Sequence, residues 1–572
     1  MKKRFCAAAC AAIAIGAIAL AAFKADDRDF KISKNLDIFL SVFKTLNLNY
    51  VDAPDPDRIV PVAINAMLAD LDPYSAYIPE EGRDVYKFQI DGEYGGVGCI
   101  ISMSSDTNLV CVKEVYRDSP SDKAGLKPGD LFLNIDGADV RGMRVDEVSS
   151  KLRGKAGDPI KVVVQRPGQP KNLTFNFHRD VIRMGSLDYY GMLDDQTGYI
   201  CLHGFETGCA NDFKNAFLDL RDNKGAKRLI LDLRGNPGGL LDESLQIVNY
   251  FVPRGVKILA CKGRRKVMDR TYTAFREPLD TVIPLAVMID RVSASASEIV
   301  AGALQDLDRA VILGQRSFGK GLVQATHEVA YDGLLKVTAA KYYTPSGRCV
   351  QAIDYSTRDE NGAVGYVPDS LISEFRTRGG RKVYDGGGIS PDVMLSNRDY
   401  KPVCLSVVMG DYPFRYALSF LAHNKPLPLD ANGYISDQTY ADFVNFMKAQ
   451  PNFSYKTATQ TAYDRLVAAA KAENLYDGQK EAIDALAKPL APDIDRDMAD
   501  AKEQVKPLIE DEMLRINGYR RDAFAHSLQY DDNIQSAAEL LADTQRYKGI
   551  LDGSVHSHAG DKRASQPRKK SK

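Results

Sequence analysis

Three serines alternate with alanines in Ser293-Ala-Ser295-Ala-Ser297, directly after the apolar run 284–290 and before a helical pattern. The apolar run predicts a strand. A serine between that strand and the helix would lie at the positive end of the helix dipole, with its hydroxyl exposed at the sheet edge. This position favours a nucleophile. The local pattern by itself favours ordinary helix capping, because Glu298, three residues beyond Ser295, could close a capping box, and spacing alone does not choose among the three serines.

A lysine between two glycines, Gly319-Lys320-Gly321, follows the next apolar run of the sequence. An ordinary lysine has a pKa of about 10.4 and holds its proton at neutral pH, but burial lowers that pKa by roughly 3–5 pH units. A neutral Lys320 would serve as general base for a serine hydroxyl in place of histidine. In an extended chain, the side chains of Lys320 and Gln324 would face the same side.

Other catalytic patterns lack their partners. Only His178, His203 and His327 lie in or beside the predicted core. His327 begins a zinc-protease pattern that fails because Tyr331 replaces the second histidine. A hydrolase with His203 or His327 as its base is a rival interpretation. Residues 41–44 match a Ser-x-x-Lys pattern without its companion motifs, so we interpret that match as coincidence.

A glycine-rich turn, Gly235-Asn-Pro-Gly238-Gly239, joins the apolar run 228–234 to another helical pattern. Backbone N–H groups at a helix start stabilise a developing negative charge. This turn is therefore a candidate oxyanion hole, and the alternative is an ordinary tight connection between strand and helix.

A second glycine cluster, Gly95-Gly96-Val97-Gly98, precedes an apolar strand. Successive N–H groups in such a loop can hold a carboxylate. Residues 119–130 read Ser-Pro-x-x-x-Ala-Gly-Leu-x-x-Gly-Asp, and together with the glycine cluster they closely resemble a PDZ domain of bacterial proteases. That resemblance implies capture of a peptide by strand addition, with its C-terminal carboxylate in the glycine loop.

These motifs lie in a chain of 572 residues, enough for several domains. It is 44% hydrophobic with a net charge of −1, which argues against disorder and against a nucleic-acid binder. Nine cysteines without Cys-x-x-Cys argue against a zinc module, and no phosphate loop occurs, so we expect no metal and no cofactor. Composition divides the chain into six parts: a signal peptide or membrane anchor (1–25), a helical region (28–90), a β-rich module (91–180), a mixed α/β core (181–400), a helical domain (401–553) and a polar basic tail (554–572). Within the helical domain we expect helix breaks at Pro489, Pro492, Pro507 and Gly518.

The first residues predict export. Lys2, Lys3 and Arg4 precede an apolar run from Phe5 to Phe23, the pattern of a signal peptide or a retained anchor. We therefore expect a periplasmic protein or one anchored in the inner membrane facing the periplasm.

The core motifs resemble the S41 family of carboxyl-terminal processing, or tail-specific, serine proteases. The resemblance rests on the serine and Gly-Lys-Gly motifs, on Leu231-Asp-Leu-Arg-Gly-Asn-Pro-Gly-Gly239, and on residues 71–79, 198–205, 343–348 and 388–392. It implies a multidomain α+β protein with a core of the ClpP/crotonase class. In that family the nucleophile falls on Ser295, the base on Lys320 and a supporting glutamine on Gln324.

The same resemblance assigns supporting roles. Asp306 matches a residue that helps to order the site, and the oxyanion hole would combine Ala296 with either Gly238 or Gly239. It implies a serine endopeptidase that acts on polypeptides with accessible C-termini. The helical regions are candidate sites for a homodimer or an adaptor protein. The alternative is a non-catalytic PDZ scaffold with a vestigial protease core.

Overall fold

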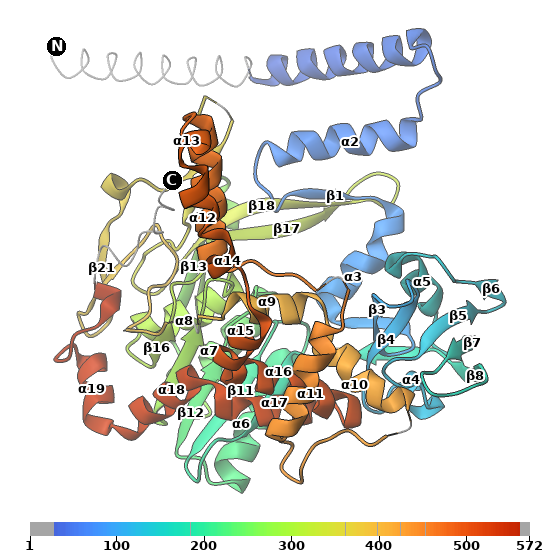
Figure 1. Ribbon diagram of the computed structural model, residues 1–572. Coiled ribbons are helices and arrows are strands. Elements are labelled where there is room, and N and C mark those ends of the chain that lie inside the picture. The colour runs from blue at the N-terminus through green and yellow to red at the C-terminus, as the bar shows by residue number, and fades with distance from the viewer. Residues whose placement is uncertain are drawn as a thin grey trace, which may run out of the picture. The chain divides into compact units, whose positions relative to one another are not determined.

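The computed structural model describes residues 28–183, 185–360, 362–396, 399–423, 425–451 and 453–560. The predicted signal or anchor at 1–25 lies outside these ranges. Among the described helices, none combines the length and the apolar character that a membrane span requires. The chain forms two compact units (Figure 1): one extends to Glu80 and includes Thr326–Val337, and the other holds Glu81–Ala325 and Thr338 onward.

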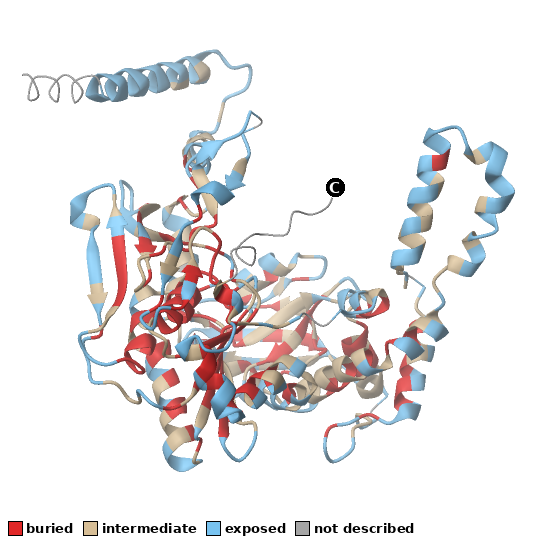
Figure 2. Cartoon of the chain, turned by 90° about the vertical axis from the view of Figure 1, so that its left-hand side faces the viewer, coloured by how far each residue is buried: buried red, intermediate tan, exposed pale blue. Residues whose placement is uncertain are grey.

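The first unit is mainly helical. Residues 28–49 form an exposed helix (Figure 2), and α2 (Pro56–Ala69) follows it. The sequence analysis did not anticipate strand β1 (Ala76–Ile78), which pairs antiparallel with the start of β18 (Leu334–Tyr343). β18 in turn pairs with β17 (Leu322–Glu328).

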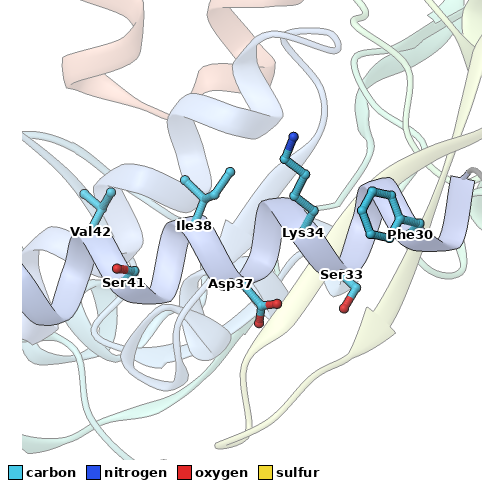
Figure 3. Close-up of a pocket in the computed structure, with 7 residues that line it drawn as sticks. All are labelled: Phe30, Ser33, Lys34, Asp37, Ile38, Ser41 and Val42. Carbon is cyan, nitrogen blue, oxygen red and sulfur yellow. The ribbon is translucent and has the colours of Figure 1, made fainter.

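A pocket of about 480 Å³ lies along the helix at 28–49 (Figure 3). Ser41, from the isolated Ser-x-x-Lys pattern, is one of its lining residues, and Ser41 and Lys44 are both exposed. The nearby Lys34 points away from Ser41 in Figure 3. The interpretation of the pattern at 41–44 as coincidence stays a prediction. The lining residues are Phe30, Ser33, Lys34, Asp37, Ile38, Ser41 and Val42.

The second unit begins with α3 (Arg83–Asp91) and a PDZ-like module. Its antiparallel sheet has the order β3-β4-β5-β7-β8, with β6 beside β5, and a separate ribbon pairs β2 with β9. Apolar residues of the sheet pack against Val148 and Leu152 of helix α5. The bounds are β2 (Glu93–Gly96), β3 (Cys99–Met103), β4 (Val110–Val115), α4 (Pro120–Ala124), β5 (Leu131–Ile135), β6 (Ala138–Asp139), α5 (Val145–Leu152), β7 (Pro159–Gln165), β8 (Leu173–His178) and β9 (Asp180–Arg183).

A six-stranded sheet forms the α/β core, in the order β10-β11-β12-β15-β16-β23. All neighbours are parallel except the edge strand β10, which is antiparallel to β11. Side chains alternate between the two faces, as strand geometry requires. The elements are β10 (Leu187–Met192), β11 (Thr197–Leu202), α6 (Cys209–Leu218), β12 (Arg228–Asp232), α7 (Leu241–Asn249), β15 (Leu285–Ile289), α8 (Ala296–Asp306), β16 (Val311–Gly314) and β23 (Val393–Met394).

Both faces of this sheet are covered. Ile200 and Leu231 face the cluster that contains α6, α7 and α8, whereas Tyr199 and Ile230 face the other side. That other side is covered by the last helices of the chain, α17 (Arg520–Ser527), α18 (Asp532–Ala542) and α19 (Thr544–Asp552). The predicted core therefore needs residues from the C-terminal region to bury its second face.

Smaller sheets surround the core. The inner part of β18 pairs with β13 (Lys257–Gly263), which also pairs with β14 (Arg270–Thr273). Two short ribbons follow, formed by β19 (Ile353–Arg358) with β20 (Val364–Tyr366) and by β21 (Glu374–Arg376) with β22 (Lys382–Tyr384).

The C-terminal helical domain has its own apolar cluster. The helices that share it are α9 (Pro402–Met409), α10 (Tyr412–Ala422), α11 (Asp437–Lys448), α15 (Ile494–Asp500) and α16 (Lys502–Asn517). Between α11 and α15, an arm of α12 (Ala458–Ala472), α13 (Tyr476–Asp484) and α14 (Ala487–Leu490) is largely exposed (Figure 2).

Two details of this region correct the sequence analysis. The predicted helix break at Pro507 is wrong, because α16 continues through it. The missing N–H of a proline within a helix costs stability, and burial of Ile509 and Met513 on the same helix offsets that cost. The predicted polar tail also begins as ordered structure, since Ser557 Oγ donates to Asp392 Oδ1 at 2.8 Å and His558 N donates to Asp392 O at 3.0 Å.

Candidate active site

A single buried carboxylate joins the serine motif to the lysine motif. Glu298, in the first turn of α8, is 0% exposed, and its Oε2 accepts the backbone N–H of Ser295 at 2.9 Å and of Lys320 at 2.8 Å. Its Oε1 accepts the N–H of Gly319 at 2.8 Å and the hydroxyl of Ser317 at 2.5 Å. The backbone nitrogens of Ser295 and Lys320 therefore lie less than about 6 Å apart.

Burial raises the pKa of Glu298 above its ordinary value, and the hydrogen bond from Ser317 and those from the three N–H groups offset this only in part. Four donors thus share the two oxygens of this one buried carboxylate. The half of the capping box that the sequence suggested is present, since Glu298 binds Ser295 N–H. The same carboxylate also holds the Gly-Lys-Gly turn, which the local pattern did not reveal.

The three serines of the motif differ in their surroundings. Ser293 Oγ donates to Leu233 O at 2.8 Å, and Ser297 Oγ donates to Asn236 O at 3.0 Å. Both serines are 0% exposed, whereas Ser295 is half-buried. Two of the three hydroxyls are thus enclosed and bonded to main-chain carbonyls, whereas Ser295 is the one of the three that is partly exposed.

The backbone at Ser295 is strained. Its φ of 54° and ψ of −110° are unusual for a residue with a side chain, and such conformations cost about 1–3 kcal/mol. Its N–H is held by Glu298, and its carbonyl accepts from Ile299 N at 2.9 Å and from Tyr342 OH at 3.2 Å. These bonds fix a sharp turn between strand and helix that presents the Ser295 side chain at the start of α8.

The glycine turn packs directly against this serine. A Cβ placed on Gly238 would lie 2.9 Å from Ser295 Cβ and 3.0 Å from Ala296 N, so only glycine permits the approach. The N–H of Gly238 donates to Asn236 Oδ1 at 2.8 Å. Within the described part of the chain, the N–H groups of Gly239 and Ala296 have no hydrogen-bond acceptor. Of the two glycines left open by the sequence, Gly239 has the uncommitted donor.

Lys320 is half-buried and lies two residues before β17, between two tightly packed glycines. A Cβ on Gly319 would meet Ala352 Cβ at 2.4 Å, and a Cβ on Gly321 would meet Gln351 N at 2.8 Å. The backbone around Lys320 is thus clamped on both sides. Gln324 lies within β17, where its Nε2 donates to Thr338 Oγ1 of β18 at 3.2 Å.

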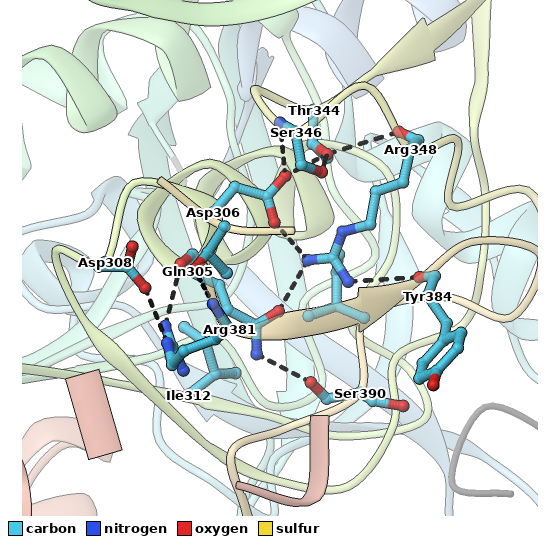
Figure 4. A network of polar contacts seen from close by, with 12 residues as sticks. Gln305, Asp306, Asp308, Ile312, Thr344, Ser346, Arg348, Arg381, Tyr384 and Ser390 are labelled. Carbon is cyan, nitrogen blue, oxygen red and sulfur yellow. Dashed lines mark hydrogen bonds and ion pairs between the residues drawn. The ribbon is translucent and has the colours of Figure 1, made fainter. Parts of the chain in front are cut away.

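Asp306 lies away from these residues, at the far end of α8. Asp306 is the eleventh residue of α8 after the cap residue Ser295, about 16 Å along the helix axis. It belongs to a buried polar network (Figure 4), in which its carboxylate accepts from Thr344 Oγ1 at 2.5 Å and lies 2.8 Å from Arg348 Nη2. Thr344, which binds Asp306, comes two residues after Tyr342, whose hydroxyl binds Ser295 O. The segment 342–344 therefore connects Asp306 with the serine turn.

The PDZ module contains a groove of about 600 Å³ between β3 and α5, a volume typical of ligand sites. The predicted glycine loop is shorter than expected: Gly95 and Gly96 belong to strand β2, and only Val97 and Gly98 turn into β3. Gly95 and Gly96 are held in extended conformation because their strand, β2, pairs with β9. The groove is lined by Phe88, Tyr94, Val97, Cys99, Ile101, Tyr116, Val145, Asp146, Ser149, Leu152 and Arg153.

Comparison with known proteins identifies the family. A carboxy-terminal-processing protease of Bartonella bacilliformis is 36% identical over 344 residues, which are 60% of this chain and 76% of that protein. The chain belongs to peptidase family S41. The model of that family matches residues 196–358, a PDZ domain model matches 111–166, and a model described as "Probable PDZ-protease, C-terminal helical domain" matches 405–541.

Other similarities of this S41 chain are weaker. A "Probable CtpA-like serine protease" of Staphylococcus aureus is 32% identical over 319 residues, 55% of this chain and 62% of that protein. The solved photosystem II D1 C-terminal processing protease is 27% identical, covers 62% of this chain and 86% of its own, and has a TM-score of 0.34. The predicted family and the multidomain fold with a PDZ domain are confirmed. A homodimer or an adaptor stays a prediction.

Sequence reasoning on this S41 chain missed three supporting residues. The sequence suggests only a capping role for Glu298, it includes Asn236 in the glycine turn without a role of its own, and it gives no role to Tyr342. Asn236 is 0% exposed and fixes the glycine turn from both sides, since its Nδ2 also donates to Leu202 O at 2.7 Å. The one available signal was the position of Asn236 inside the Gly-x-x-Gly-Gly turn, because buried amides commonly hold turns through backbone bonds.

Proposed function

We propose that this S41 chain is an exported serine endopeptidase with Ser295 as nucleophile and Lys320 as general base. The observation that carries the proposal is the shared Glu298 oxygen, which holds the backbones of both residues beside two uncommitted N–H groups. Ser295 is half-buried while its neighbours Ser293 and Ser297 are enclosed, and this supports its choice as the nucleophile.

The proposed reaction is acyl transfer. Neutral Lys320 Nζ accepts the hydroxyl proton as Ser295 Oγ attacks the peptide carbonyl, and the N–H groups of Ala296 and Gly239 stabilise the resulting oxyanion. The lysine then returns the proton to the leaving amine, which departs with the C-terminal fragment. A water molecule, deprotonated by Lys320, hydrolyses the acyl-enzyme and frees Ser295. Each oxyanion donor of this kind contributes roughly 3–4 kcal/mol in other serine proteases.

Substrate selection would use the PDZ groove. Its apolar lining and its open strand edge at β3 favour an extended peptide with an apolar C-terminal side chain, bound by strand addition. Export is inferred from residues 1–25, in which three basic residues precede an apolar run. The substrates would accordingly be polypeptides outside the cytoplasm.

The test uses a serine-directed fluorophosphonate and β-casein, with no metal or nucleotide added. Wild-type protein should be labelled and should degrade casein, whereas Ser295→Ala and Lys320→Ala should lose both properties. Ser41→Ala and Lys44→Ala are matched controls from the exposed Ser-x-x-Lys pattern and should behave as wild type. Casein degradation by Ser295→Ala would overturn the proposal, and full activity of Lys320→Ala would favour a histidine base.

The non-catalytic scaffold gives a different result in the same experiment. The PDZ groove would bind a peptide with a free C-terminus, yet neither labelling nor cleavage would occur in the wild-type protein. The groove is formed without any residue of the serine or lysine motifs, so this alternative has a structural basis.

A further inference from the structure

A cluster of ion pairs joins three parts of the second unit, away from the proposed catalytic residues. Arg515 of α16 lies with its Nη1 3.7 Å from Glu114 Oε2 on PDZ strand β4. Arg520 of α17 lies with its Nη2 3.1 Å from Asp188 Oδ1 on core strand β10. Glu114 is 6% exposed; this burial raises its pKa, and the charges of Arg515 and Arg520 act in the opposite direction. The two arginines of the helical domain thus connect a PDZ carboxylate with a core carboxylate.

Further contacts fasten the same edge of the PDZ domain to the helical domain. Lys113 Nζ lies 2.6 Å from Asp411 Oδ1, 3.4 Å from Glu512 Oε1 and 3.7 Å from the centre of the Phe414 ring. The Arg117 guanidinium lies 4.2 Å from the centre of the Tyr519 ring. Lys113 belongs to β4 and Arg117 comes four positions after Lys113, so these contacts come from one short segment of the PDZ domain.

Two close backbone approaches complete this interface. A Cβ on Gly129 would lie 2.6 Å from a methyl carbon of Leu418, and one on Gly168 would lie 2.7 Å from Ala422 O. The hydroxyl of Tyr519 donates to Asp122 Oδ2 at 3.0 Å. The PDZ domain is therefore held closely along this edge, while its groove is lined by residues of α3 and the PDZ domain alone.

The fastened segment also reaches the peptide groove. Tyr116 lines the groove and stands between Glu114 and Arg117, which both contact the helical domain. Its N–H donates to Gly98 O at 3.0 Å, in the turn that leads into β3. A peptide in the groove would thus contact Tyr116, and the charged residues on either side of it, Glu114 and Arg117, are bound to the helical domain.

From the core carboxylate, a second path leads to the candidate active site. Asp188 Oδ1 lies 3.3 Å from Nδ1 of His203, which follows strand β11. Two residues later, Phe205 N donates to Gly238 O at 3.2 Å and Phe205 O accepts from Leu240 N at 2.7 Å. These bonds hold the glycine turn that packs against Ser295.

We propose that the C-terminal helical domain couples the PDZ groove to the catalytic serine, with Arg515 and Arg520 as positioning residues that tie Glu114 to Asp188. This inference rests on the proposed function for its consequence on catalysis. A peptide that shifts the Tyr116 segment changes the ion cluster, and the cluster transmits the change through His203 and Phe205 to the glycine turn. Coupling of this kind is reciprocal and typically amounts to 5–150-fold.

The first test measures coupling without catalysis. The probe is a decapeptide ending in Val-Ala-Ala with a free carboxylate, and its amidated form is the control. Hydrogen–deuterium exchange of full-length wild type should change over residues 515–522 when the free-acid peptide binds, although no groove residue lies there. The change should be absent in Glu114→Gln and present in Arg141→Gln, a control that removes an exposed PDZ arginine bound to Asp139. An unchanged exchange rate in wild type would overturn the inference.

The second test measures the effect on Ser295. The rate of fluorophosphonate labelling should change at least about 5-fold with the free-acid peptide in wild type and in Arg141→Gln. In Glu114→Gln and Arg520→Gln the ratio should fall to about 1, while peptide affinity stays within about 2-fold. Arg520→Lys keeps the charge and should restore part of the ratio. The Arg520 side chain is 44% exposed, so its variants should fold. A lower labelling ratio in them would then reflect lost coupling.

The two tests separate the possible failures. Peptide-dependent labelling that persists in both variants would overturn the inference and leave the proposed function standing. If wild-type Ser295 is not labelled at all, the proposed function fails, and the exchange experiment alone decides whether the helical domain responds to the PDZ groove.

Discussion

Ser295 and Lys320 are 25 positions apart in the sequence, yet both donate their backbone N–H to the same oxygen of Glu298, at 2.9 and 2.8 Å. A shared acceptor of this kind fixes the distance between two backbones more strictly than packing alone, because hydrogen-bond energy falls steeply with misalignment. The serine turn and the lysine turn therefore move together or not at all. In the proposed protease, that restraint sets the alignment of nucleophile and base.

Replacing the shared acceptor should separate catalysis from ligand binding. Glu298→Gln places an NH₂ group where the carboxylate accepted two bonds, so at least one buried donor loses its partner. We expect the free energy of unfolding to fall by about 1–3 kcal/mol and kcat for casein peptides to fall about 100-fold. Urea denaturation and steady-state kinetics measure the two effects.

A second carboxylate provides the control for that variant. Glu243 of α7 accepts the N–H groups of Gly208 and Ala210 at 2.9 and 2.8 Å, at the start of α6. Glu243→Gln should lose similar stability and keep kcat. Equal losses of kcat in both variants would show that Glu298 acts only through general stability.

The two neighbouring serines should respond oppositely to the same substitution. Ser295→Ala removes the proposed nucleophile and should abolish hydrolysis with little change in the free energy of unfolding. Ser293→Ala removes the 2.8 Å donor of Leu233 O and the 2.9 Å acceptor of the Asp290 N–H at a residue that is 0% exposed, so we expect a loss of about 1–2 kcal/mol with most activity kept. Thermal denaturation and casein turnover distinguish the two outcomes, and inactive but stable Ser293→Ala protein would reassign the nucleophile.

How far the sequence predicted this arrangement depends on the range of each interaction. The strands β12, β15 and β16 follow from local apolar runs, and the junction with Ser295 follows from strand and helix patterns. The double role of Glu298 was not predictable, because its second set of donors comes from a segment about twenty residues away. Similarly, amphipathic stripes in the C-terminal region indicate buried faces but not which surface covers them. The choice among Ser293, Ser295 and Ser297 required burial, which no spacing rule provides.

The pair of His203 and Asp188 makes stability depend on pH. The Asp188 carboxylate raises the pKa of His203 above its ordinary 6.5, and burial partly opposes this. Burial raises the pKa of Asp188, but His203 and the nearby arginines outweigh burial and lower it. Since the folded-state pKa of His203 is the higher one, its contribution is complete below pH 6.5 and is lost as pH rises through the folded value.

The measurement compares the Tm of wild type with that of His203→Gln. The difference should be larger at pH 5.5 than at pH 8.5, because the protonated form of His203, which pairs with Asp188, is lost as pH rises. Asp188 remains ionised at both pH values, so it does not account for the change. A difference that grows toward pH 8.5 would contradict the assigned direction.

The glycine turn offers a matched pair of substitutions. Gly238 has a φ of 103°, and an added Cβ would approach Ala294 O to 2.7 Å and Ser295 Cβ to 2.9 Å, so Gly238→Ala must displace the turn from the serine. Gly235 has a φ of 71° with open space around its Cβ position, so Gly235→Ala meets only the backbone cost of about 1 kcal/mol. We expect kcat to fall about 100-fold in Gly238→Ala and to change less than about 3-fold in Gly235→Ala. Wild-type kcat in a folded Gly238→Ala protein would show that this turn takes no part in stabilising the oxyanion.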